Sequence, residues 1–404
     1  MGSEWRKVIF SEAIEINPSR KLIKGQKYPF IDMQALEPFT RKVSNITYKK
    51  YNGSGSKFRN GDTLFARITP CLENGKTSYL NELKDGELGF GSTEFIVFSG
   101  KEGITDKLFV YYLSRTPEIR DFAIKNMTGT SGRQRVDKQC FDKLEINLPP
   151  LSEQQKIASI LSAFDDKIEL NNEMNKTLEE IAQAIFKHWF IDFEFPNENG
   201  EPYKSSGGEF VESELGPIPK GWRVGKLGEI CDVNMGQSPP SDTYNLDGIG
   251  LPFYQGVKDF GIKYPSVTMY CSAPKKIANE GDILLSVRAP VGKINIAIEK
   301  CCIGRGLAAL KMKNSANNYL YYLLLNQKNN WIKFESGSVF AAINKTTIEN
   351  LPIFIPPINL IKKFNTLIKP LDEMVLNNTK ESLLLSQLRD TLLPKLISGE
   401  IRVV

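Results

Sequence analysis

The 404-residue sequence contains a single histidine, His188, and six cysteines, none of them in a CxxC pair. Zinc sites usually combine Cys and His ligands at short spacing, so this set argues against a metal-binding protein. The sequence also lacks the GxxxxGK[ST], GxGxxG, GxSxG and HExxH patterns of phosphate, dinucleotide, acyl-transfer and metalloprotease sites. One histidine cannot complete a Ser-His-Asp triad in a globular domain when it lies on a long helix. We therefore expect a non-catalytic chain without a cofactor of its own.

Long apolar runs are absent as well. No stretch approaches the 18 residues of a membrane span, and the first ten residues lack the apolar core of a signal peptide. We expect no contact with a membrane and a cytoplasmic location. The length is sufficient for two or three domains with ample cores.

What the sequence does contain is a tandem duplication. Residues 148–195 and 355–401 align at an offset of 207 positions, which places Asp165 on Asp372 and Asn171 on Asn378. Weaker matches link the segments before them, such as GDTLFARITP from Gly61 with GDILLSVRAP from Gly281, and FVYYL from Phe109 with YLYYL from Tyr319. The predicted domains are a globule (1–150), a helix (151–195), a linker rich in Gly, Pro, Ser and Glu (196–221), a second globule (222–357) and a second helix (358–404).

Each 207-offset segment reads as one long helix, because apolar residues return every three or four positions. They are Ile157, Leu161, Phe164, Ile168, Leu178, Ile185 and Trp189 in the first copy, and Phe364, Ile368, Leu371, Val375, Leu385, Leu392 and Leu396 in the second. Amides or a hydroxyl interrupt the seam at matching places, at Asn171 and Asn175 and at Asn378 and Ser382. Polar residues on such a seam fix the register of a coiled coil. The neighbouring carboxylates Asp165 and Asp166 are interpreted as a solvated charged face.

The chain path predicts the direction of pairing. A helix of about 39 residues spans about 58 Å, so a parallel pair would require the second globule to return the chain over that length. We expect an antiparallel coiled coil. Short strands between turn residues, with one helical segment in each globule around 106–125 and 317–334, predict two similar α+β globules.

The net charge of +5 is unevenly distributed. Residues 1–150 hold 24 basic and 18 acidic side chains and residues 222–357 hold 15 and 10, whereas residues 151–195 hold 4 and 9. Binding of a polyanion is therefore expected at the globules, and the first helix is better suited to contact with protein.

The strongest candidate for DNA contact is the loop TGTSGRQRVD from residue 128 to 137. Its hydroxyls, amide and guanidinium groups suit phosphate contact and bidentate base reading, with a purely structural loop as the alternative. The candidates are Thr128, Thr130, Ser131, Arg133, Gln134 and Arg135. The matching segment 335–344 replaces the arginines with apolar residues, so the two globules should read different sequences; its candidates are Ser336, Ser338 and Asn344. Basic candidates for which ordinary solvated charge is an equal interpretation are Lys57, Arg59, Arg67, Lys275, Lys276, Arg288 and Arg305.

Each helix also carries a second apolar line beside its seam, which needs a cover. A partner protein is one cover, and an aromatic cluster at the end of the first helix is typical of interface hot spots. The neighbouring globule is the alternative. The docking candidates are Ile160, Ile181, Phe186, Trp189 and Phe190 on the first helix, and Leu367, Leu388, Leu393 and Ile397 on the second.

This order of globule, helix, globule, helix resembles the DNA-specificity subunit of type I restriction-modification systems. The resemblance covers nearly the whole chain and rests on LPPLSEQQKIASILSAFDDKI and FKHWFIDFEF around the first helix, GPIPKGW before the second globule, GQSPPS at 236–241 and LPKLISGEI at the end. The second helix departs from the pattern, opening with PPINLIKKF where the first has PPLSEQQKI.

The resemblance implies that each globule is a target-recognition domain reading half of a bipartite double-stranded DNA site. The helices would set the unread spacer and dock two methyltransferase subunits, with endonuclease/translocase subunits joining outside. S-adenosylmethionine, Mg²⁺ and ATP would belong to those partners. From the residues alone, a protein-binding scaffold and a methyltransferase with an unrecognised site stay open.

Overall fold

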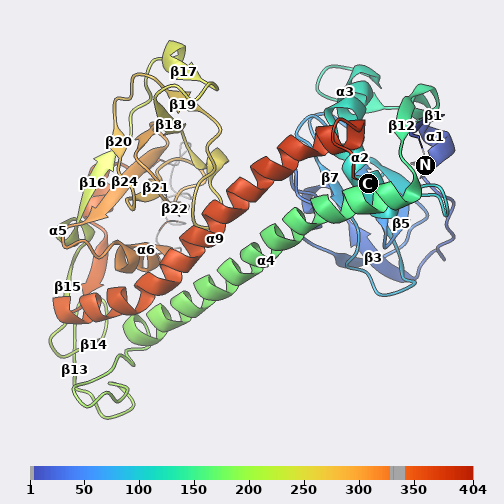
Figure 1. Ribbon diagram of the computed structural model, residues 1–404. Coiled ribbons are helices and arrows are strands. Elements are labelled where there is room, and N and C mark those ends of the chain that lie inside the picture. Colours follow the sequence, from blue (N-terminus) through green and yellow to red (C-terminus); the bar gives the residue numbers. More distant parts are fainter. Residues whose placement is uncertain (1–3, 328–330, 332–341, 404) are drawn as a thin grey trace. The chain divides into compact units, whose positions relative to one another are not determined.

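The computed structural model describes residues 4–327, 331 and 342–403. It divides into two compact units: unit 1 comprises the residues up to 171 and those from 381 onward, and unit 2 comprises residues 172–380. Each unit holds one globule and part of each long helix, and each is described by itself (Figure 1). None of the helices in the described ranges is long and apolar enough to cross a membrane.

Unit 1 contains two four-stranded sheets. One has the order β2-β9-β6-β7 and is antiparallel; the other has the order β4-β3-β8-β5, with β3 and β8 parallel. Strands β1 and β12 form a separate pair, as do β10 and β11. The strands are β1 (Arg6–Ile9), β2 (Ile14–Ile16), β3 (Lys27–Ile31), β4 (Thr47–Lys50), β5 (Ser56–Arg59), β6 (Asp62–Ala66), β7 (Thr77–Tyr79), β8 (Leu88–Gly91), β9 (Phe95–Gly100), β10 (Met127–Thr128), β11 (Arg135–Val136) and β12 (Glu145–Leu148).

The helices of this globule are α1 (Phe10–Ala13), η1 (Met33–Ala35), α2 (Lys107–Arg115), α3 (Pro117–Lys125) and η2 (Lys138–Lys143). The helix expected around 106–125 is therefore two helices. Thr116 is extended because Pro117 disfavours a helical conformation in the residue before it, and the proline then starts α3. Every residue of β6 is buried, since the sheet packs in the core with α2 over it.

Unit 2 repeats this topology. Its antiparallel sheet β16-β24-β21-β22 has the same strand order as β2-β9-β6-β7, and the pair β15-β25 corresponds to β1-β12. Its second sheet, β17-β19-β18-β23-β20, also contains one parallel pair, β18 with β23. The strands are β13 (Phe210–Val211), β14 (Ile218–Pro219), β15 (Arg223–Lys226), β16 (Cys231–Met235), β17 (Tyr244–Asn245), β18 (Leu251–Tyr254), β19 (Tyr270–Cys271), β20 (Ile277–Ala278), β21 (Ile283–Ser286), β22 (Ile294–Ile296), β23 (Cys301–Ile303), β24 (Leu307–Met312) and β25 (Pro352–Ile355).

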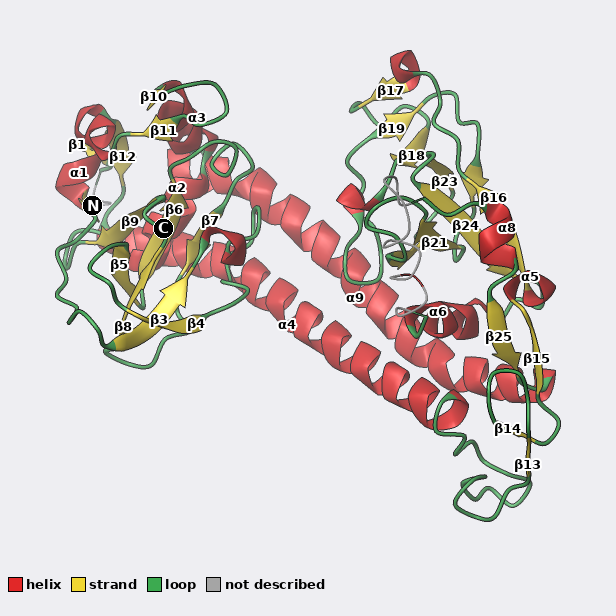
Figure 2. Cartoon of the chain, turned by 180° about the vertical axis from the view of Figure 1, so that it is seen from behind, coloured by secondary structure: helices red, strands yellow, loops and turns green. Residues whose placement is uncertain are grey.

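The shorter helices of unit 2 are α5 (Leu227–Ile230), η3 (Ser241–Thr243), η4 (Val257–Asp259), α6 (Asn317–Leu325) and α8 (Lys345–Glu349). The expected two α+β globules are confirmed (Figure 2). The helix expected over 317–334 is described as α6, and the remainder of that range lies largely outside the described residues.

The two long helices, α4 (Leu151–Phe190) and α9 (Ile358–Ser398), pair antiparallel in both units. In unit 1, Asn171 donates to Glu381 Oε2 at 2.7 Å, and Asp165 lies farther along beside Arg389. In unit 2, the ring centroids of Phe186 and Phe364 lie 5.6 Å apart. The contacts therefore pair increasing residue numbers on α4 with decreasing residue numbers on α9, which confirms the predicted antiparallel coiled coil.

The polar positions of the seam meet each other as predicted. Asn171 Nδ2 lies 3.3 Å from Ser382 Oγ in unit 1; in unit 2, Asn378 donates to Asn175 Oδ1 at 2.9 Å. A shift by one helical turn would bury these amides against hydrocarbon, so the pairs specify the register. The two ends of the predicted linker, residues 196–221, lie close together. The ring of Phe195, which precedes the linker, stacks on Tyr203 within it at 4.6 Å and on Trp222, which follows it, at 5.6 Å.

Candidate DNA interface and docking surfaces

The 128–137 loop of unit 1 is a short hairpin on the edge of the globule. Strands β10 and β11 pair Thr128 with Arg135, and Gly129 and Gly132 have φ of 125° and 77°, values that favour glycine in a tight turn. The backbone of Gln134 bonds to Thr69, whose amide donates to the Gln134 carbonyl at 3.0 Å. The hairpin is therefore tied to the sheet at its base. The remaining predicted side chains project from it exposed: Thr128, Thr130, Ser131, Arg133 and Arg135.

Three of the predicted arginines lie in or beside this hairpin, and their surroundings differ. Arg135 makes a two-pronged ion pair with Glu94, with Nε and Nη2 at 2.9 and 2.8 Å from Oε1, and this carboxylate raises the pKa of the guanidinium. Arg67 is half-buried, and its Nε has no hydrogen-bond partner among the described residues. Arg133 is exposed and has no ion pair with any residue in the described ranges. Arg133 is thus the arginine of this loop that is most available to a ligand.

The other predicted basic residues of unit 1 lie on β5. Lys57 Nζ donates to the Arg20 carbonyl at 2.8 Å, while the Arg59 side chain is exposed. Lys57 is therefore engaged in holding the Arg20 segment, and Arg59 alone of the two is free to meet a ligand.

In unit 2 the predicted residues occupy separate exposed loops. Lys275, Lys276 and Arg288 are exposed, and Arg288 pairs through its backbone with Ala342, near the end of the 335–344 segment that matches the 128–137 loop. Arg305 is exposed, and its amide donates to Ser238 of the GQSPPS segment at 3.3 Å. Asn344 caps α8 by accepting from the Thr347 amide, a structural role. Ser336 and Ser338 lie outside the described residues.

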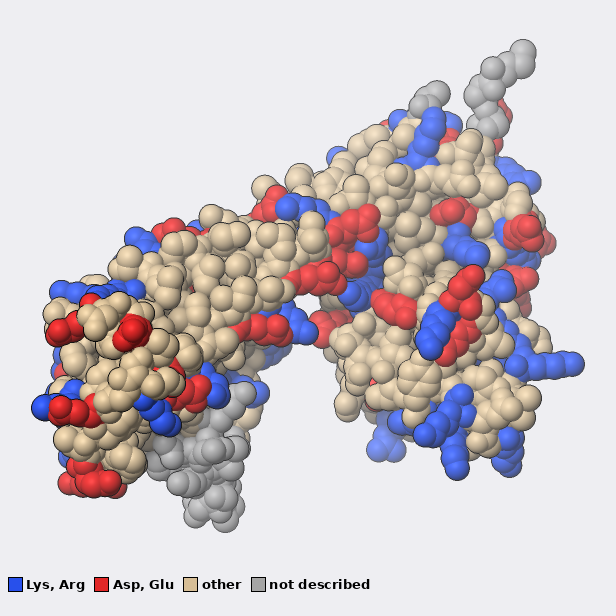
Figure 3. Space-filling model, turned by 90° about the horizontal axis from the view of Figure 1, so that it is seen from below, with Lys and Arg blue, Asp and Glu red and all other residues tan. Residues whose placement is uncertain are grey.

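The structure also assembles a basic edge that the sequence reasoning missed. Register places Lys27 opposite Lys50 and Tyr28 opposite Lys49, beside the turn that leads into β3. The lysines of this edge are all exposed: Lys21, Lys24, Lys27, Lys49 and Lys50. Lys and Arg side chains gather along the lower edge of this unit in the space-filling view (Figure 3). In the sequence, the three-residue spacing of Lys21, Lys24 and Lys27 was a signal that could have indicated this edge.

Both globules expose a large apolar side chain on the turn before the parallel strand pair. Ile23 is 62% exposed in unit 1, and Leu246 is 78% exposed in unit 2. The two residues correspond when Pro29-Phe30 of β3 is aligned with Pro252-Phe253 of β18. Each is followed two residues later by a glycine in the left-handed region, Gly25 at φ 89° and Gly248 at φ 78°. A turn with an exposed apolar residue and a left-handed glycine is therefore present at the matching place of both globules.

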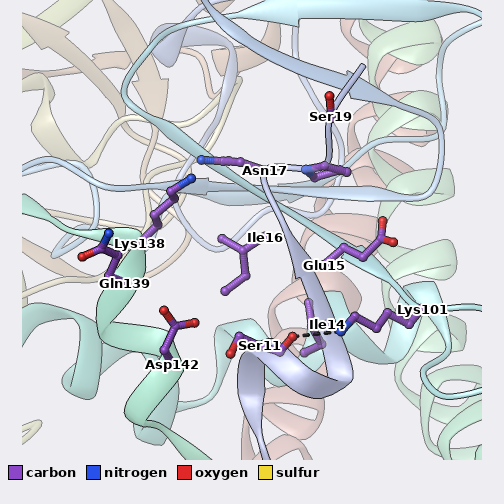
Figure 4. A pocket seen from close by; sticks show the side chains of 11 residues that line it. Ser11, Ile14, Glu15, Ile16, Asn17, Ser19, Lys101, Lys138, Gln139 and Asp142 are labelled. Atoms are coloured by element: carbon purple, nitrogen blue, oxygen red, sulfur yellow. Dashed lines mark hydrogen bonds between the residues drawn. The ribbon is translucent and has the colours of Figure 1, made fainter. Parts of the chain in front are cut away.

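One groove of unit 1 carries mixed charge and does not resemble an active site. Its volume is about 640 Å³, and α1, β2 and η2 contribute to its lining (Figure 4). Lys101 Nζ donates to the carbonyls of Ser11 and Glu12 at 2.9 and 2.7 Å, so it caps the end of α1. Lys138, Glu15 and Asp142 also line this groove. Within the described ranges, no group of three or more His, Cys, Asp and Glu could hold a metal ion.

The docking prediction is partly wrong. Phe186 and Phe190 lie in the core of unit 2 against Tyr319 and Phe364, and Leu393 and Ile397 lie in the core of unit 1 with α2. These four side chains are at most 4% exposed, because this part of each second apolar line packs on the globule of the unit in which it lies. Trp189 is half-buried, 6.0 Å from the Phe364 ring.

The remaining docking candidates are exposed and form two repeat-related pairs. Ile160 and Leu367 are 37% and 47% exposed, and Ile181 and Leu388 are both 44% exposed. The members of each pair are 207 positions apart, the offset of the duplication. Exposed apolar side chains at equivalent places of two repeats are a surface that a symmetric pair of partners could use.

Asp165 corrects a second expectation. It is 2% exposed and belongs to a buried cluster in unit 1, where Tyr112 on α2 donates to its Oδ2 at 2.7 Å and Arg389 on α9 bonds to its Oδ1. Arg115 Nη1 lies 4.0 Å from the same carboxylate. Its neighbour Asp166 is on the solvated side and bonds to Arg41 at 2.6 Å. The paired carboxylates thus serve as an anchor between helix and globule.

Unit 2 has the matching cluster around Asp372. Tyr322 on α6 lies 3.0 Å from Asp372 Oδ1 and 3.1 Å from Glu179, and Lys263 Nζ lies 2.5 Å from Asp372 and 2.7 Å from Glu179. Burial raises the pKa of Asp372, and the neighbouring Glu179 adds to this effect against the opposing Lys263. Two buried carboxylates share one ammonium here.

With this geometry in place, comparison with known proteins decides the family. The model of the type I restriction modification DNA specificity domain matches twice, over residues 3–180 and 219–385. The chain belongs to this family. Each match includes one globule and much of one long helix, so the duplication seen in the sequence and in the two topologies is a duplication of the specificity domain.

Relatives and a solved structure agree with this assignment. Two specificity subunits of Methanocaldococcus jannaschii are similar to the chain. The putative specificity subunit of the type I restriction enzyme MjaX is 34% identical, and the match covers 85% of this chain and 79% of the relative. The specificity subunit of MjaIX is 32% identical, and the match covers 75% of this chain and 71% of the relative. The crystal structure of the type I restriction-modification S subunit from M. genitalium matches 97% of this chain and 96% of its own with a TM-score of 0.57 at 17% identity, a likeness of fold.

Proposed function

We propose that this chain is the sequence-reading, non-catalytic subunit of a type I restriction-modification complex, in which each globule reads one half of a bipartite DNA target. The observation that carries the proposal is the contrast between a repeated frame and unlike loops. The sheets, the buried Asp-Tyr anchors and the helix seam recur in both units, whereas the 128–137 loop and its counterpart share little beyond Gly and Ser. Such a frame presents two different reading surfaces in equivalent settings.

The contacts with DNA would be of two kinds. The exposed lysines around β3 and β4 suit phosphate oxygens, which hold a protein on the duplex without reading sequence. Arg133 and the hydroxyls of the 128–137 loop suit base edges in the major groove. Arg135 would join them when Glu94 releases it.

The test is a mobility shift with the purified chain on random DNA and on a target taken from the methylome of its host. The target should bind more tightly than random DNA, and the affinity should fall steeply with salt because phosphate contacts release counterions. Replacing Lys24, Lys27, Lys49 and Lys50 with Gln should flatten the salt slope, while the same change at Lys300 and Lys313, elsewhere on the surface, serves as the control. A chain that binds no DNA at low salt would point instead to the protein-binding scaffold.

The helices would dock two methyltransferase subunits, one on each repeat-related apolar pair, and set the unread spacer between the half-sites. Endonuclease/translocase subunits would join those partners, which would also bring S-adenosylmethionine, Mg²⁺ and ATP. A complex that acts on DNA would work in the cytoplasm.

Docking is tested by the double variant Ile181→Asp with Leu388→Asp, whose side chains are both 44% exposed. A charge at these positions should abolish methyltransferase co-purification while circular dichroism and the DNA shift stay unchanged. The matched control is Val211→Asp, equally exposed at 44% but on β13 and not on a long helix. Partner binding at unchanged stoichiometry would move the docking surface to the globules.

A further inference from the structure

The turn that leads into β3 holds an aliphatic side chain in water on a fixed backbone. Ile23 is 62% exposed, and its carbonyl accepts from the Gln26 amide at 3.2 Å, which closes a four-residue turn. Gly25, at φ 89°, occupies the third position, where a type II turn requires a positive φ. The Ile23 amide donates to the Tyr28 hydroxyl at 3.1 Å, and the Gly25 amide donates to the Tyr51 carbonyl at 2.8 Å. Hydrogen bonds and a glycine therefore fix this turn without help from the Ile23 side chain.

Exposed lysines lie on and beside this turn, and they separate Ile23 from an ordinary exposed apolar residue. Single exposed apolar side chains are common and need no explanation by themselves. Here the turn closes the end of the β3–β4 pair, where Lys27 lies opposite Lys50. Strand β4 is the edge of its sheet, and all four of its residues are exposed. Within the ranges that the structure describes, none of these lysines has an ion pair with a carboxylate: Lys21, Lys24, Lys27, Lys49 and Lys50.

The charge of this cluster indicates the kind of partner that covers Ile23. Ammonium groups gathered on one edge repel each other, and a polyanion laid against them relieves the repulsion. The phosphates of a DNA duplex supply that charge on both sides of a groove. An apolar side chain between phosphate-binding lysines then faces the bases, which are the apolar part of the duplex.

The second globule has a similar turn but not this charge. Leu246 is 78% exposed, and Gly248, at φ 78°, follows two residues later. Asn245 Oδ1 accepts from the Asp247 amide at 3.1 Å and so shapes this turn. The alignment that matches Leu246 with Ile23 places Asp247 where the first turn has Lys24. An exposed apolar residue is thus common to the two turns, whereas the basic surroundings belong to unit 1.

We infer that Ile23 is an intercalating side chain: on the bound duplex it enters the minor groove and partly unstacks one base step, while the neighbouring lysines hold the phosphates. Apolar side chains of this size open base steps in this way and bend the duplex. Unstacking costs least at pyrimidine–purine steps, which are flexible, and most in stiff A-tracts. Ile23 therefore adds a preference for a flexible step at a position that no hydrogen bond reads. This inference rests on the proposed function, since it requires that unit 1 bind DNA.

The test uses the full chain and duplexes of the methylome target in which 2-aminopurine replaces one adenine at a time. This base brightens when its stacking is lost, and the absence of a methyltransferase excludes base flipping by a partner. One position should brighten on binding. Ile23→Ser should abolish the signal, and Ile23→Leu, which keeps a branched aliphatic side chain, should retain it. Leu246→Ser, the matched change on the turn of unit 2, should leave it unchanged.

A second measurement addresses the preference for a flexible step. Replacing the bright step and its neighbours by an A-tract should weaken binding of the unchanged chain about tenfold, because a stiff duplex resists opening. The same replacement should have little effect on Ile23→Ser, which opens no step. Circular dichroism should be the same for all variants, because the side chain is exposed.

Target binding without any bright position, or with equal brightening by the unchanged chain and Ile23→Ser, would overturn the inference and leave the proposed function standing. Loss of methyltransferase co-purification in Ile23→Ser, with the DNA signals unaltered, would overturn it by assigning Ile23 to a protein partner. A chain that binds neither target nor random DNA would refute the proposed function, and the role of Ile23 with it.

Discussion

The two helix–globule anchors use the same acid and the same phenol but different cations. Asp165 with Tyr112 and Asp372 with Tyr322 occupy equivalent positions of the duplication, with O···O distances of 2.7 and 3.0 Å. In unit 1 the neutralising Arg389 comes from the second long helix; in unit 2 Lys263 comes from a loop of the globule. A buried carboxylate must be paired and hydrogen-bonded, but the pairing group can come from any element nearby. The anchor is thus preserved while the chain segments that complete it are exchanged.

The largest effect that separates the two anchors should come from removing their cations. Lys263→Met leaves Glu179 and Asp372 buried without an ammonium, which should cost unit 2 about 3–5 kcal/mol. Arg389→Met should cost unit 1 less, because Arg115 and Tyr112 still face Asp165. Urea titration with hydrogen exchange resolved by unit measures both. Lys369→Met, on an exposed side chain, is the control and should change stability by less than about 0.5 kcal/mol.

Equal losses in the two variants, or a larger loss in Arg389→Met, would show that Arg115 does not support Asp165. The anchors would then be equivalent despite their different cations, and the sharing of one ammonium by two carboxylates in unit 2 would have no energetic counterpart.

The recognition loops differ more than the anchors, and a smaller effect should expose that difference. Arg133→Ala should weaken binding to the first half-site by about 1–3 kcal/mol and relax its sequence there, without effect on the second half-site. Arg135→Ala should weaken the same half-site. The methylome of each variant, together with mobility shifts on both half-sites, supplies the measurement.

Glu94→Gln decides how Arg135 acts. If Arg135 reads DNA, removing the carboxylate that holds it should strengthen binding to the first half-site. If Arg135 only anchors the loop, the same change should loosen the hairpin and weaken binding. Equal losses of Arg133→Ala and Arg135→Ala on random and specific DNA would reassign both arginines to phosphate contact.

The sequence predicted the frame well because the frame depends on local periodicity. Apolar spacing and the amides at Asn171, Asn175 and Asn378 predicted an antiparallel pair that the structure confirms. Prediction from the sequence failed where the burial of a side chain depends on contacts with residues that are distant along the chain. Phe190 and Leu393 are indistinguishable by spacing from Ile181 and Leu388, yet a globule covers the first two. Asp165 appeared solvated because its partners Tyr112 and Arg389 lie 53 and 224 positions away.

The candidate DNA residues show the same division. The exposed loop at 128–137 could be found from its composition, whereas the ion pair of Arg135 with Glu94 depends on a contact 41 positions away along the chain. The lysine edge required the register of β3 with β4, which brings Lys27 opposite Lys50. Which of these residues contact DNA stays a prediction.

The smallest expected difference between the units is their response to pH. The pKa of Asp372 in unit 2 is raised by burial, so its contribution to stability is present below the ordinary Asp value of about 3.9 and is lost as the pH rises through the raised pKa. The pKa of Glu153 in unit 1 is lowered, chiefly by its bond to Arg402, so its contribution is present above the ordinary Glu value and is lost as the pH falls. The two units should therefore respond in opposite directions between acid and neutral pH.

Hydrogen exchange corrected for intrinsic rates at each pH would follow both units in one sample. Asp372→Asn should remove the decline in unit 2, and Glu153→Gln the gain in unit 1, each leaving the other unit as it was. Lys263, Tyr322, Tyr264 and Glu179 face Asp372, so Glu179→Gln should also shrink the decline by lowering the raised pKa. Parallel responses of the two units would mean that Lys263 neutralises Asp372 fully, and the asymmetry between the anchors would then lie in geometry and not in charge.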